Sequence, residues 1–189
     1  MAVSAIIVKG NKIDLKPVEA GDIPVLWNLI YGEEKPEFKK WDAPYFPWKR
    51  VDFEPFESGM LERIEKGQDT QWLIMAEEEI IGSVTYYWEY EPTNWMEIGI
   101  TIYSPNHWNG GYGTEAIKLW TSHLFRKFPQ IPRLGYTTWS GNKRMIQVGL
   151  KLGMQEEARI RKARFYNGEY YDSVKLGVLR EEWEEIYGK

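Results

Sequence analysis

The stretch that decides the fold is residues 108–114, which read Trp-Asn-Gly-Gly-Tyr-Gly-Thr. A strand-like run ends near Tyr103, the Ser-Pro-Asn at 104–106 marks a turn, and a helical pattern begins at Gly111. The N-terminus of a helix carries unpaired N–H groups and the positive end of the helix dipole, and glycine lets a ligand approach the backbone closely. The stretch is therefore typical of a diphosphate-binding turn, although glycines also occur in such turns for geometry alone.

Two other phosphate-binding motifs do not fit this stretch. A Walker loop continues with Gly-Lys-Ser or Gly-Lys-Thr, whereas Gly113 is followed by Thr114 and Glu115. The dinucleotide-binding fingerprint needs a parallel βαβ unit with an acidic residue closing its second strand. The strands before residue 103 read instead as antiparallel, and no acidic residue takes that place.

Three runs upstream, rich in β-branched and aromatic residues, predict an antiparallel meander. They span residues 71–76, 80–90 and 95–103. The shorter apolar runs 3–8 and 12–17 flank Gly10-Asn11 and predict either a hairpin or one strand with a preceding arm.

Helical spacing predicts two helices in the N-terminal third, at residues 23–30 and 53–66. Asp22 is the expected N-cap of the first helix, and Pro24 suits its first turn. Between them, residues 31–52 are broken by prolines yet rich in aromatic side chains. Such a segment either packs against the core or lines a pocket.

Downstream, the pattern predicts a helix at 111–128, a strand at 134–139, a second helix at 142–152 and a charged helix at 180–187. Strands separated by helices favour a parallel crossover. The inward side chains expected on the second helix are Met145, Ile146, Gly149 and Leu150. A hairpin of residues 154–166 and 169–179 is expected around Asn167-Gly168. The predicted fold is thus α+β: a mixed central sheet with an antiparallel N-terminal meander, a parallel crossover and a C-terminal hairpin, flanked by helices.

Length and composition limit the function. A chain of 189 residues fits one domain with a full core. With no cysteine there is no disulfide or thiolate site, and with two histidines a histidine-rich metal site is excluded, so we expect no metal. A net charge of −4 with mixed signs argues against a nucleic-acid binder. No signal peptide or transmembrane segment is recognised, so we expect no membrane association and a cytoplasmic location.

Residues 107–116, His-Trp-Asn-Gly-Gly-Tyr-Gly-Thr-Glu-Ala, resemble the acetyl-CoA loop of the GNAT superfamily of N-acetyltransferases, and most of all its RimJ/RimL-type branch. Asn109 departs mildly from that branch, which often has glycine there. The likeness extends in order to Glu-Ile-Gly-Ile at 97–100, Asn142, Lys-Leu-Gly-Met at 151–154 and the Asn-Gly hairpin. It runs over nearly the whole chain and implies a single N-acetyltransferase domain over residues 1–189.

The resemblance implies where acetyl-CoA binds as co-substrate. The backbone of Ile100, Thr101 and Ile102 is expected to pair with the pantetheine amides, and a strand N–H near Ile100 to steady the oxyanion. The backbone amides of the glycine-rich turn are expected to hold the diphosphate. The full set predicted to bind the cofactor is Ile100, Thr101, Ile102, Trp108, Asn109, Gly110, Gly111, Tyr112, Gly113, Thr114 and Asn142.

The chemistry needs a neutral amine, whereas an α-amine has a pKa of roughly 8. Glu97, on the strand that leads to the turn, is the predicted base, and the alternative is an ordinary surface glutamate. Asn142 is predicted to hydrogen-bond near the thioester, to cap its own helix, or both. Relatives often place Tyr or Ser on that helix as an acid, but Met145 takes this position, so a dedicated acid is in doubt.

The aromatic loop supplies the expected acceptor wall, with Trp41, Tyr45, Phe46 and Trp48 as contacts. The predicted reaction is acetyl transfer to a primary amine, and the branch implies a protein N-terminal α-amine such as that of a ribosomal protein. The alternatives are a small amine such as a polyamine, amino sugar or antibiotic, or a non-catalytic CoA-binding module. A homodimer through the final hairpin and helix is compatible with the pattern, which does not require one.

Overall fold

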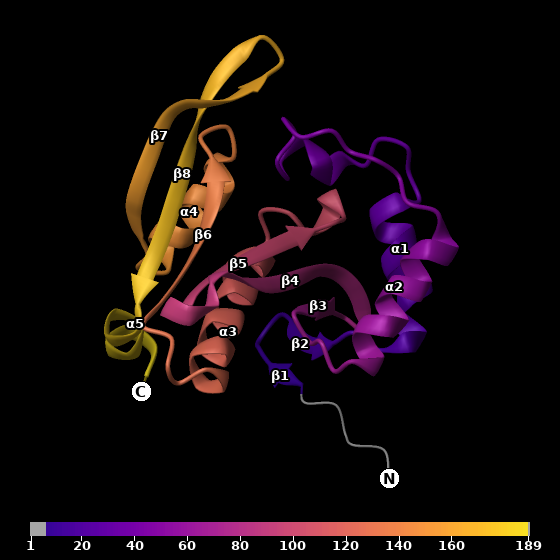
Figure 1. Ribbon diagram of the computed structural model, residues 1–189, viewed down its shortest axis with the longest axis horizontal. Coiled ribbons are helices and arrows are strands. Elements are labelled where there is room, and N and C mark those ends of the chain that lie inside the picture. Colours follow the sequence, from indigo (N-terminus) through magenta and orange to yellow (C-terminus); the bar gives the residue numbers. More distant parts are fainter. Residues whose placement is uncertain (1–6, 189) are drawn as a thin grey trace.

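One eight-stranded mixed sheet organises the computed structural model, which describes residues 7–188 (Figure 1). The strand order is β1-β2-β3-β4-β5-β6-β8-β7, and β5–β6 is the parallel pair. The strands are β1 (Val8–Lys9), β2 (Asp14–Pro17), β3 (Gln71–Ala76), β4 (Glu79–Tyr90), β5 (Trp95–Ile102), β6 (Arg133–Trp139), β7 (Gln155–Tyr166) and β8 (Glu169–Leu179). The α+β prediction is confirmed. β1 and β2 form the hairpin alternative, although residues 3–6 of the first run lie outside the described residues.

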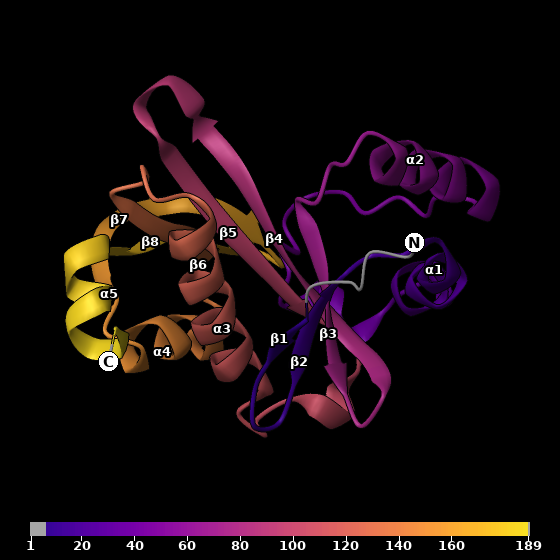
Figure 2. The same ribbon diagram turned by 90° about the horizontal axis from the view of Figure 1, so that it is seen from below.

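Helices cover both faces of the sheet (Figure 2). They are α1 (Ile23–Tyr31), α2 (Phe53–Glu65), α3 (Tyr112–Lys127), α4 (Lys143–Lys151) and α5 (Arg180–Tyr187). Successive residues of a strand point to opposite faces, and β3 shows the result. Leu73 packs with α1 and α2 in a small core, whereas Trp72 and Ile74 belong to the large core under α3. None of the helices in residues 7–188 is both long and apolar enough to cross a membrane.

The sheet opens in its middle, between β5 and β6. These strands pair at only two positions, Met96 with Leu134 and Glu97 with Gly135. Beyond them each strand stays paired on its outer side, β5 with β4 as far as Ile102 and β6 with β8 as far as Trp139. The strands therefore diverge while both remain rigid, and Figure 1 shows the wedge between them.

Two local predictions need correction. Leu150 does not point inward, since it is 45% exposed. The helix α4 ends at Lys151, and the residues that fill the core there are Leu152 and Met154. Asp22 occupies the N-cap position of α1 but does not cap it, since its carboxylate accepts hydrogen bonds from the Glu19 backbone and the Lys16 ammonium.

The C-terminal hairpin is confirmed. Asn167 and Gly168 both have positive φ, 50° and 83°, as its two-residue turn requires. A twelve-residue β7 and an eleven-residue β8 result. The tip of this hairpin and the loop that follows α1 both lie toward the open end of the wedge (Figure 1).

Candidate active site

The glycine-rich turn opens α3 with unpaired amides. Asn109 and Gly111 adopt left-handed backbone angles, with φ of 61° and 86°. The first helical bond runs from the Glu115 N–H to the Gly111 carbonyl over 3.0 Å. The N–H groups of residues 112–114 consequently lie outside the helical ladder, at the positive end of the helix dipole. This arrangement suits an anion such as a diphosphate.

The β1–β2 turn braces the glycine-rich turn. The Glu115 carboxylate accepts hydrogen bonds from the backbone N–H groups of Asn11 and Lys12. The Lys12 ammonium donates to the Gly110 carbonyl over 2.8 Å. Sequence reasoning missed Lys12, because it is about a hundred residues away in the chain. Its ammonium adds a positive charge beside the amides.

The exposed edge of β5 forms the second part of the site. Ile100, Thr101 and Ile102 lie beyond the last pairing of β5 with β6, so no strand pairs with them on that side. On the other side these residues pair with β4. An extended chain of amides, such as pantetheine, can therefore lie in the wedge and bond to this edge as an added strand would.

A cavity of about 690 Å³ fills the wedge. Most of the predicted site residues line it, from the turn, β5, α4 and the aromatic loop. Those residues are Trp41, Tyr45, Ile100, Thr101, Ile102, Trp108, Asn109, Gly111, Gly113, Thr114 and Asn142. The predicted residues that do not line it are Phe46, Trp48, Glu97, Gly110 and Tyr112.

The acceptor wall is smaller than predicted. The chain turns at Ala43, whose carbonyl accepts a hydrogen bond from the Phe46 N–H. Phe46 is 57% exposed as a result. Trp48 lies further on and stacks on Tyr31 of α1, with ring centroids 5.9 Å apart. Phe46 and Trp48, which were predicted to belong to the acceptor wall, thus lie outside the cavity lining.

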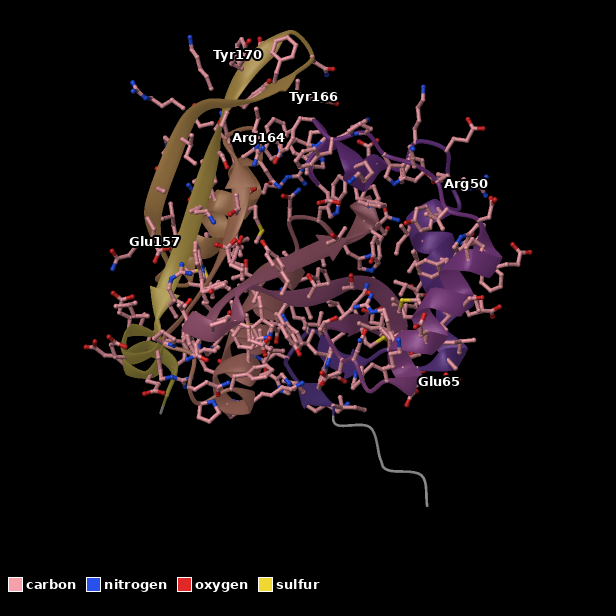
Figure 3. All side chains as sticks on the ribbon, in the orientation of Figure 1. Arg50, Glu65, Glu157, Arg164, Tyr166 and Tyr170 are labelled. Carbon is pink, nitrogen blue, oxygen red and sulfur yellow. The ribbon has the colours of Figure 1, made fainter. Side chains whose placement is uncertain are left out.

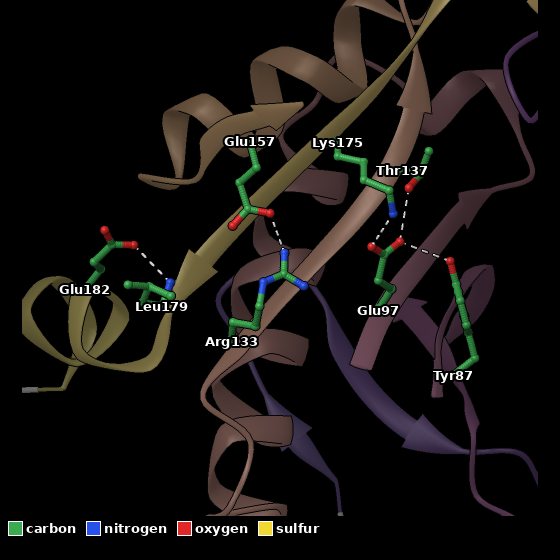
Figure 4. Close-up of polar contacts among 8 residues, drawn as sticks. All are labelled: Tyr87, Glu97, Arg133, Thr137, Glu157, Lys175, Leu179 and Glu182. Carbon is green, nitrogen blue, oxygen red and sulfur yellow. Dashed lines mark hydrogen bonds and ion pairs between the residues drawn. The ribbon is translucent and has the colours of Figure 1, made fainter. Parts of the chain in front are cut away.

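Glu97 lies at the apex of the wedge and is not a surface glutamate, since it is only 1% exposed. Its carboxylate accepts hydrogen bonds from Lys175 over 2.8 Å, Thr137 over 3.1 Å and Tyr87 over 3.2 Å (Figure 4). Burial is the main reason that the pKa of Tyr87 lies above its usual value. Glu97 itself does not line the cavity, whereas Thr137 does. The carboxylate therefore reaches the cavity only through the Thr137 hydroxyl.

Asn142 caps α4 and also joins two walls of the cavity. Its Oδ1 accepts the Met145 N–H over 3.2 Å, and its Nδ2 donates to the Trp41 carbonyl over 3.2 Å. The Trp139 indole donates to the same carbonyl over 3.0 Å. These two bonds fix the aromatic loop to the end of β6, so the acceptor side is held in place by tertiary contacts.

Arg144 bridges the open end of the wedge. Its guanidinium carbon lies 4.1 Å from the Trp41 ring centroid and 4.8 Å from that of Trp108. The Trp108 indole in turn donates to the Ile102 carbonyl over 3.0 Å. Cation–π stacking thus links the glycine-rich turn to the aromatic loop. Arg144 lines the cavity and was not predicted from the sequence.

The charges of the lining are unequal. Lys143, Arg144 and Lys151 present cations from α4, and Lys143 and Lys151 lie two helical turns apart on one face. That spacing was a signal the sequence offered. Among residues 7–188, Asp42 is the one carboxylate in the lining, and it pairs with Lys39 over 3.0 Å. Nothing in its local sequence marked Asp42 as part of the site.

A phenol occupies the region where an acid was missing. Tyr136 of β6 lines the cavity, and its hydroxyl donates to the Met145 carbonyl over 2.9 Å. Burial raises the pKa of Tyr136 above its ordinary value, so the phenol keeps its proton. The helix offers no Tyr, yet the neighbouring strand supplies one to the same place.

The family described as acetyltransferase (GNAT) domain matches residues 12–155, well over half of the chain. The chain belongs to this family. It is an N-acetyltransferase with acetyl-CoA as co-substrate, and a split sheet with unpaired amides beside it is a site that this co-substrate fits.

Relatives in Bacillus subtilis carry the same activity in their names. The SPbeta prophage-derived uncharacterized N-acetyltransferase YokL is 22% identical over 95% of this chain and 96% of its own length. The uncharacterized N-acetyltransferase YoaA is 29% identical over 54% of this chain, and that match spans 56% of its own length.

Solved structures share the fold of this GNAT domain. A GNAT-family acetyltransferase from Bacillus anthracis superposes with a TM-score of 0.72 at 18% identity, covering 93% of this chain and 99% of its own. Spermidine N-acetyltransferase from Vibrio cholerae, in complex with CoA and spermine, has a TM-score of 0.74 at 18% identity, covering 92% of this chain and 98% of its own. The ribosomal L7/L12 alpha-N-protein acetyltransferase RimL, in complex with CoA, has a TM-score of 0.73 at 15% identity, covering 92% of this chain and 98% of its own.

Proposed function

We propose that this enzyme acetylates the α-amine of a protein N-terminus, as the RimJ/RimL-type branch does, and that residues 1–189 act as one N-acetyltransferase domain. The observation that carries the choice of acceptor is the charge of the cavity lining. A polyamine carries several positive charges and favours acidic walls. In the described part of the chain, the lining has one carboxylate, Asp42, and that carboxylate is already paired with Lys39.

The acetyl donor is proposed to lie along β5 with its diphosphate on the amides of residues 112–114. Bound acetyl-CoA supplies an acetyl group activated as a thioester. The open edge of β5 at residues 100–102 orients that group. Gly113 leaves room for the approach, because the nearest atom to a Cβ built there would be the Ile100 side chain at 3.8 Å. Lys12, Lys143 and Lys151 offset the phosphate charges.

The acceptor amine must lose a proton before its nitrogen attacks the thioester carbonyl. A C–N bond then forms, the C–S bond breaks, and the thiolate leaves and takes up a proton. We assign the first proton to Glu97 through the Thr137 hydroxyl, which is hydrogen-bonded to that carboxylate and lines the cavity. Asp42 is the second candidate, because its carboxylate lines the cavity directly.

The release of free thiol from acetyl-CoA tests the proposed function. We expect turnover with peptides that have a free N-terminal amine and none with the same peptides after N-terminal acetylation. Spermidine and an amino sugar are tested beside the peptides. Turnover with one of these small amines and with no peptide would identify a small amine as the acceptor. Binding of CoA without turnover on any amine would favour the non-catalytic CoA-binding module.

The structure also bears on a homodimer through the final hairpin and α5. Ile160, Phe165 and Ile186 are each about half exposed there. These side chains are available to a second copy of the chain. Sedimentation of the purified protein at several concentrations tests this proposal, which a monomer at all of them would overturn.

A further inference from the structure

The β7–β8 hairpin brings one arginine to the rim of the acceptor side. The register of β7 with β8 shifts between Ile160 and Arg164, where β7 carries two more residues than its partner strand. Lys162 within this bulge has a φ of 54°. Such a bulge redirects side chains, and Figure 3 shows Arg164 between the hairpin and the aromatic loop.

Aromatic rings hold the Arg164 guanidinium. Its central carbon lies 4.8 Å from the ring centroid of Tyr45 and 5.6 Å from that of Phe46. Tyr45 lines the cavity and packs edge-on against Trp139, another lining residue. Stacking on a ring face leaves the N–H edge of a guanidinium available to a planar acceptor.

Arg164 has no ionic partner within residues 7–188. Its Nε is buried and makes no hydrogen bond there. Arg159 on the same strand differs, because it bonds to both Glu156 and Asp172. The side chain as a whole is only partly buried, and a charged donor without a partner is costly. A ligand carboxylate can therefore pair with the part of the guanidinium that is not covered.

Opposite charges meet near Tyr45. Burial raises the pKa of the Tyr45 phenol, the Arg164 guanidinium lowers it, and the Asp42 carboxylate raises it. Arg164 stacks on this ring at the cavity wall, and Asp42 lines the same cavity. A carboxylate at Asp42 suits an ammonium, and a guanidinium at Arg164 suits a carboxylate.

We propose that Arg164 binds a carboxylate of the acceptor, so that the preferred substrates are amines that carry a carboxylate near the reacting nitrogen. This rests on the part of the proposed function that assigns acetyl transfer to an amine, and not on the choice of a protein N-terminus. The carboxylate belongs either to an acidic side chain next to a peptide N-terminus or to a free amino acid. A polyamine lacks this group and is repelled by Arg164.

Matched acceptors test the inference on the unaltered enzyme. One pair is the peptides Ser-Glu-Ala-Ala and Ser-Gln-Ala-Ala, both with amidated C-termini, and the other is free serine and serine amide. We expect kcat/KM for the acid member of a pair to exceed that of its amide by about tenfold to hundredfold, as a charged hydrogen bond supplies. A preference for the glutamate peptide identifies an acidic peptide as the acceptor, and a preference for free serine over serine amide identifies a free amino acid.

The variant Arg164→Gln is expected to remove this preference while retaining the activity on the neutral member. Arg161→Gln is the matched control, because Arg161 is an exposed arginine of the same strand. Equal rates for both members of both pairs in the unaltered enzyme would overturn the inference, and so would a loss on acid and amide alike in Arg164→Gln. Absence of turnover on every amine would instead overturn the proposed function.

Discussion

The proposed donor and acceptor halves of the cavity are built in different ways. The donor half uses backbone groups from two neighbouring segments, β5 and residues 108–114. The acceptor half uses side chains from three distant segments, the aromatic loop, the end of β6 and the β7–β8 hairpin. Backbone sites need only a permitted local geometry, whereas side-chain sites need the whole fold. We therefore expect the donor half to depend on single local positions and the acceptor half to tolerate change while altering specificity.

The largest effect is expected from Gly111→Val. Gly111 has a φ of 86°, which a β-branched residue adopts only at a cost of about 1–3 kcal/mol. The turn should move its amides away from the diphosphate, and the KM for acetyl-CoA should rise by about a hundredfold or more. Gly168→Val is the matched control, because Gly168 has a φ of 83° and lies at the hairpin tip. Equal losses in both variants would mean that strain on the fold, and not the turn, is responsible.

Glu97→Gln is expected to lower kcat by about a hundredfold, since the acceptor proton loses its final base. Asp42→Asn should mainly raise the acceptor KM, because Asp42 lies at the cavity wall. Thermal unfolding of both variants provides the control for structural damage. If Glu97→Gln unfolds at a lower temperature with kcat unchanged, Glu97 only holds the strands together at the apex and Asp42 becomes the base.

Arg144→Gln should weaken both halves, because Arg144 stacks on Trp108 of the donor half and on Trp41 of the acceptor half. The loss of two such contacts predicts an increase of about tenfold in the KM of each substrate. Lys143→Gln removes a charge from the same helix, where no stacking partner lies among the described residues. It should raise the KM for acetyl-CoA alone. If Arg144→Gln also raises the KM for acetyl-CoA alone, Arg144 does not couple the two halves.

The smallest effect concerns the helix beneath the donor turn. His123 of α3 is stacked on Trp120, and burial lowers its pKa from 6.5 to about 4. Between pH 4 and pH 6.5 the unfolded chain therefore binds more protons than the folded chain. The contribution of His123 to the free energy of unfolding is complete above about pH 6.5 and falls as the pH drops toward 4. After screening by solvent the loss is about 1–2 kcal/mol. The unfolding temperature should fall less between pH 7 and pH 5 in His123→Gln than in the unaltered enzyme. An equal fall in both proteins would mean that other titratable groups cause the loss of stability.

Local sequence signals predicted the helices and strands well, because the spacing of apolar residues and the turn residues act over short distances along the chain. The Asn-Gly hairpin and α3 followed from residues in direct succession. The differences arose where a side chain had more than one possible partner. Asp22 accepts hydrogen bonds from Lys16 and Glu19, a few residues before it, in place of capping its helix. Trp48 stacks on Tyr31 of α1, a partner that lies in a different element.

The sequence by itself determined the glycine-rich turn, because glycines between a strand and a helix start leave amides of the first helical turn unpaired. The open edge of β5 beside it depends on the divergence of β6. Only the tertiary structure decided the acceptor half. Residues about a hundred positions apart, such as Trp41 and Trp139, meet there through one carbonyl. The tertiary structure also buried Glu97 beside Lys175 and placed Arg164 over Tyr45. The physical reason is that backbone geometry follows from local residues, whereas burial and the pairing of charges depend on which strands the fold brings together.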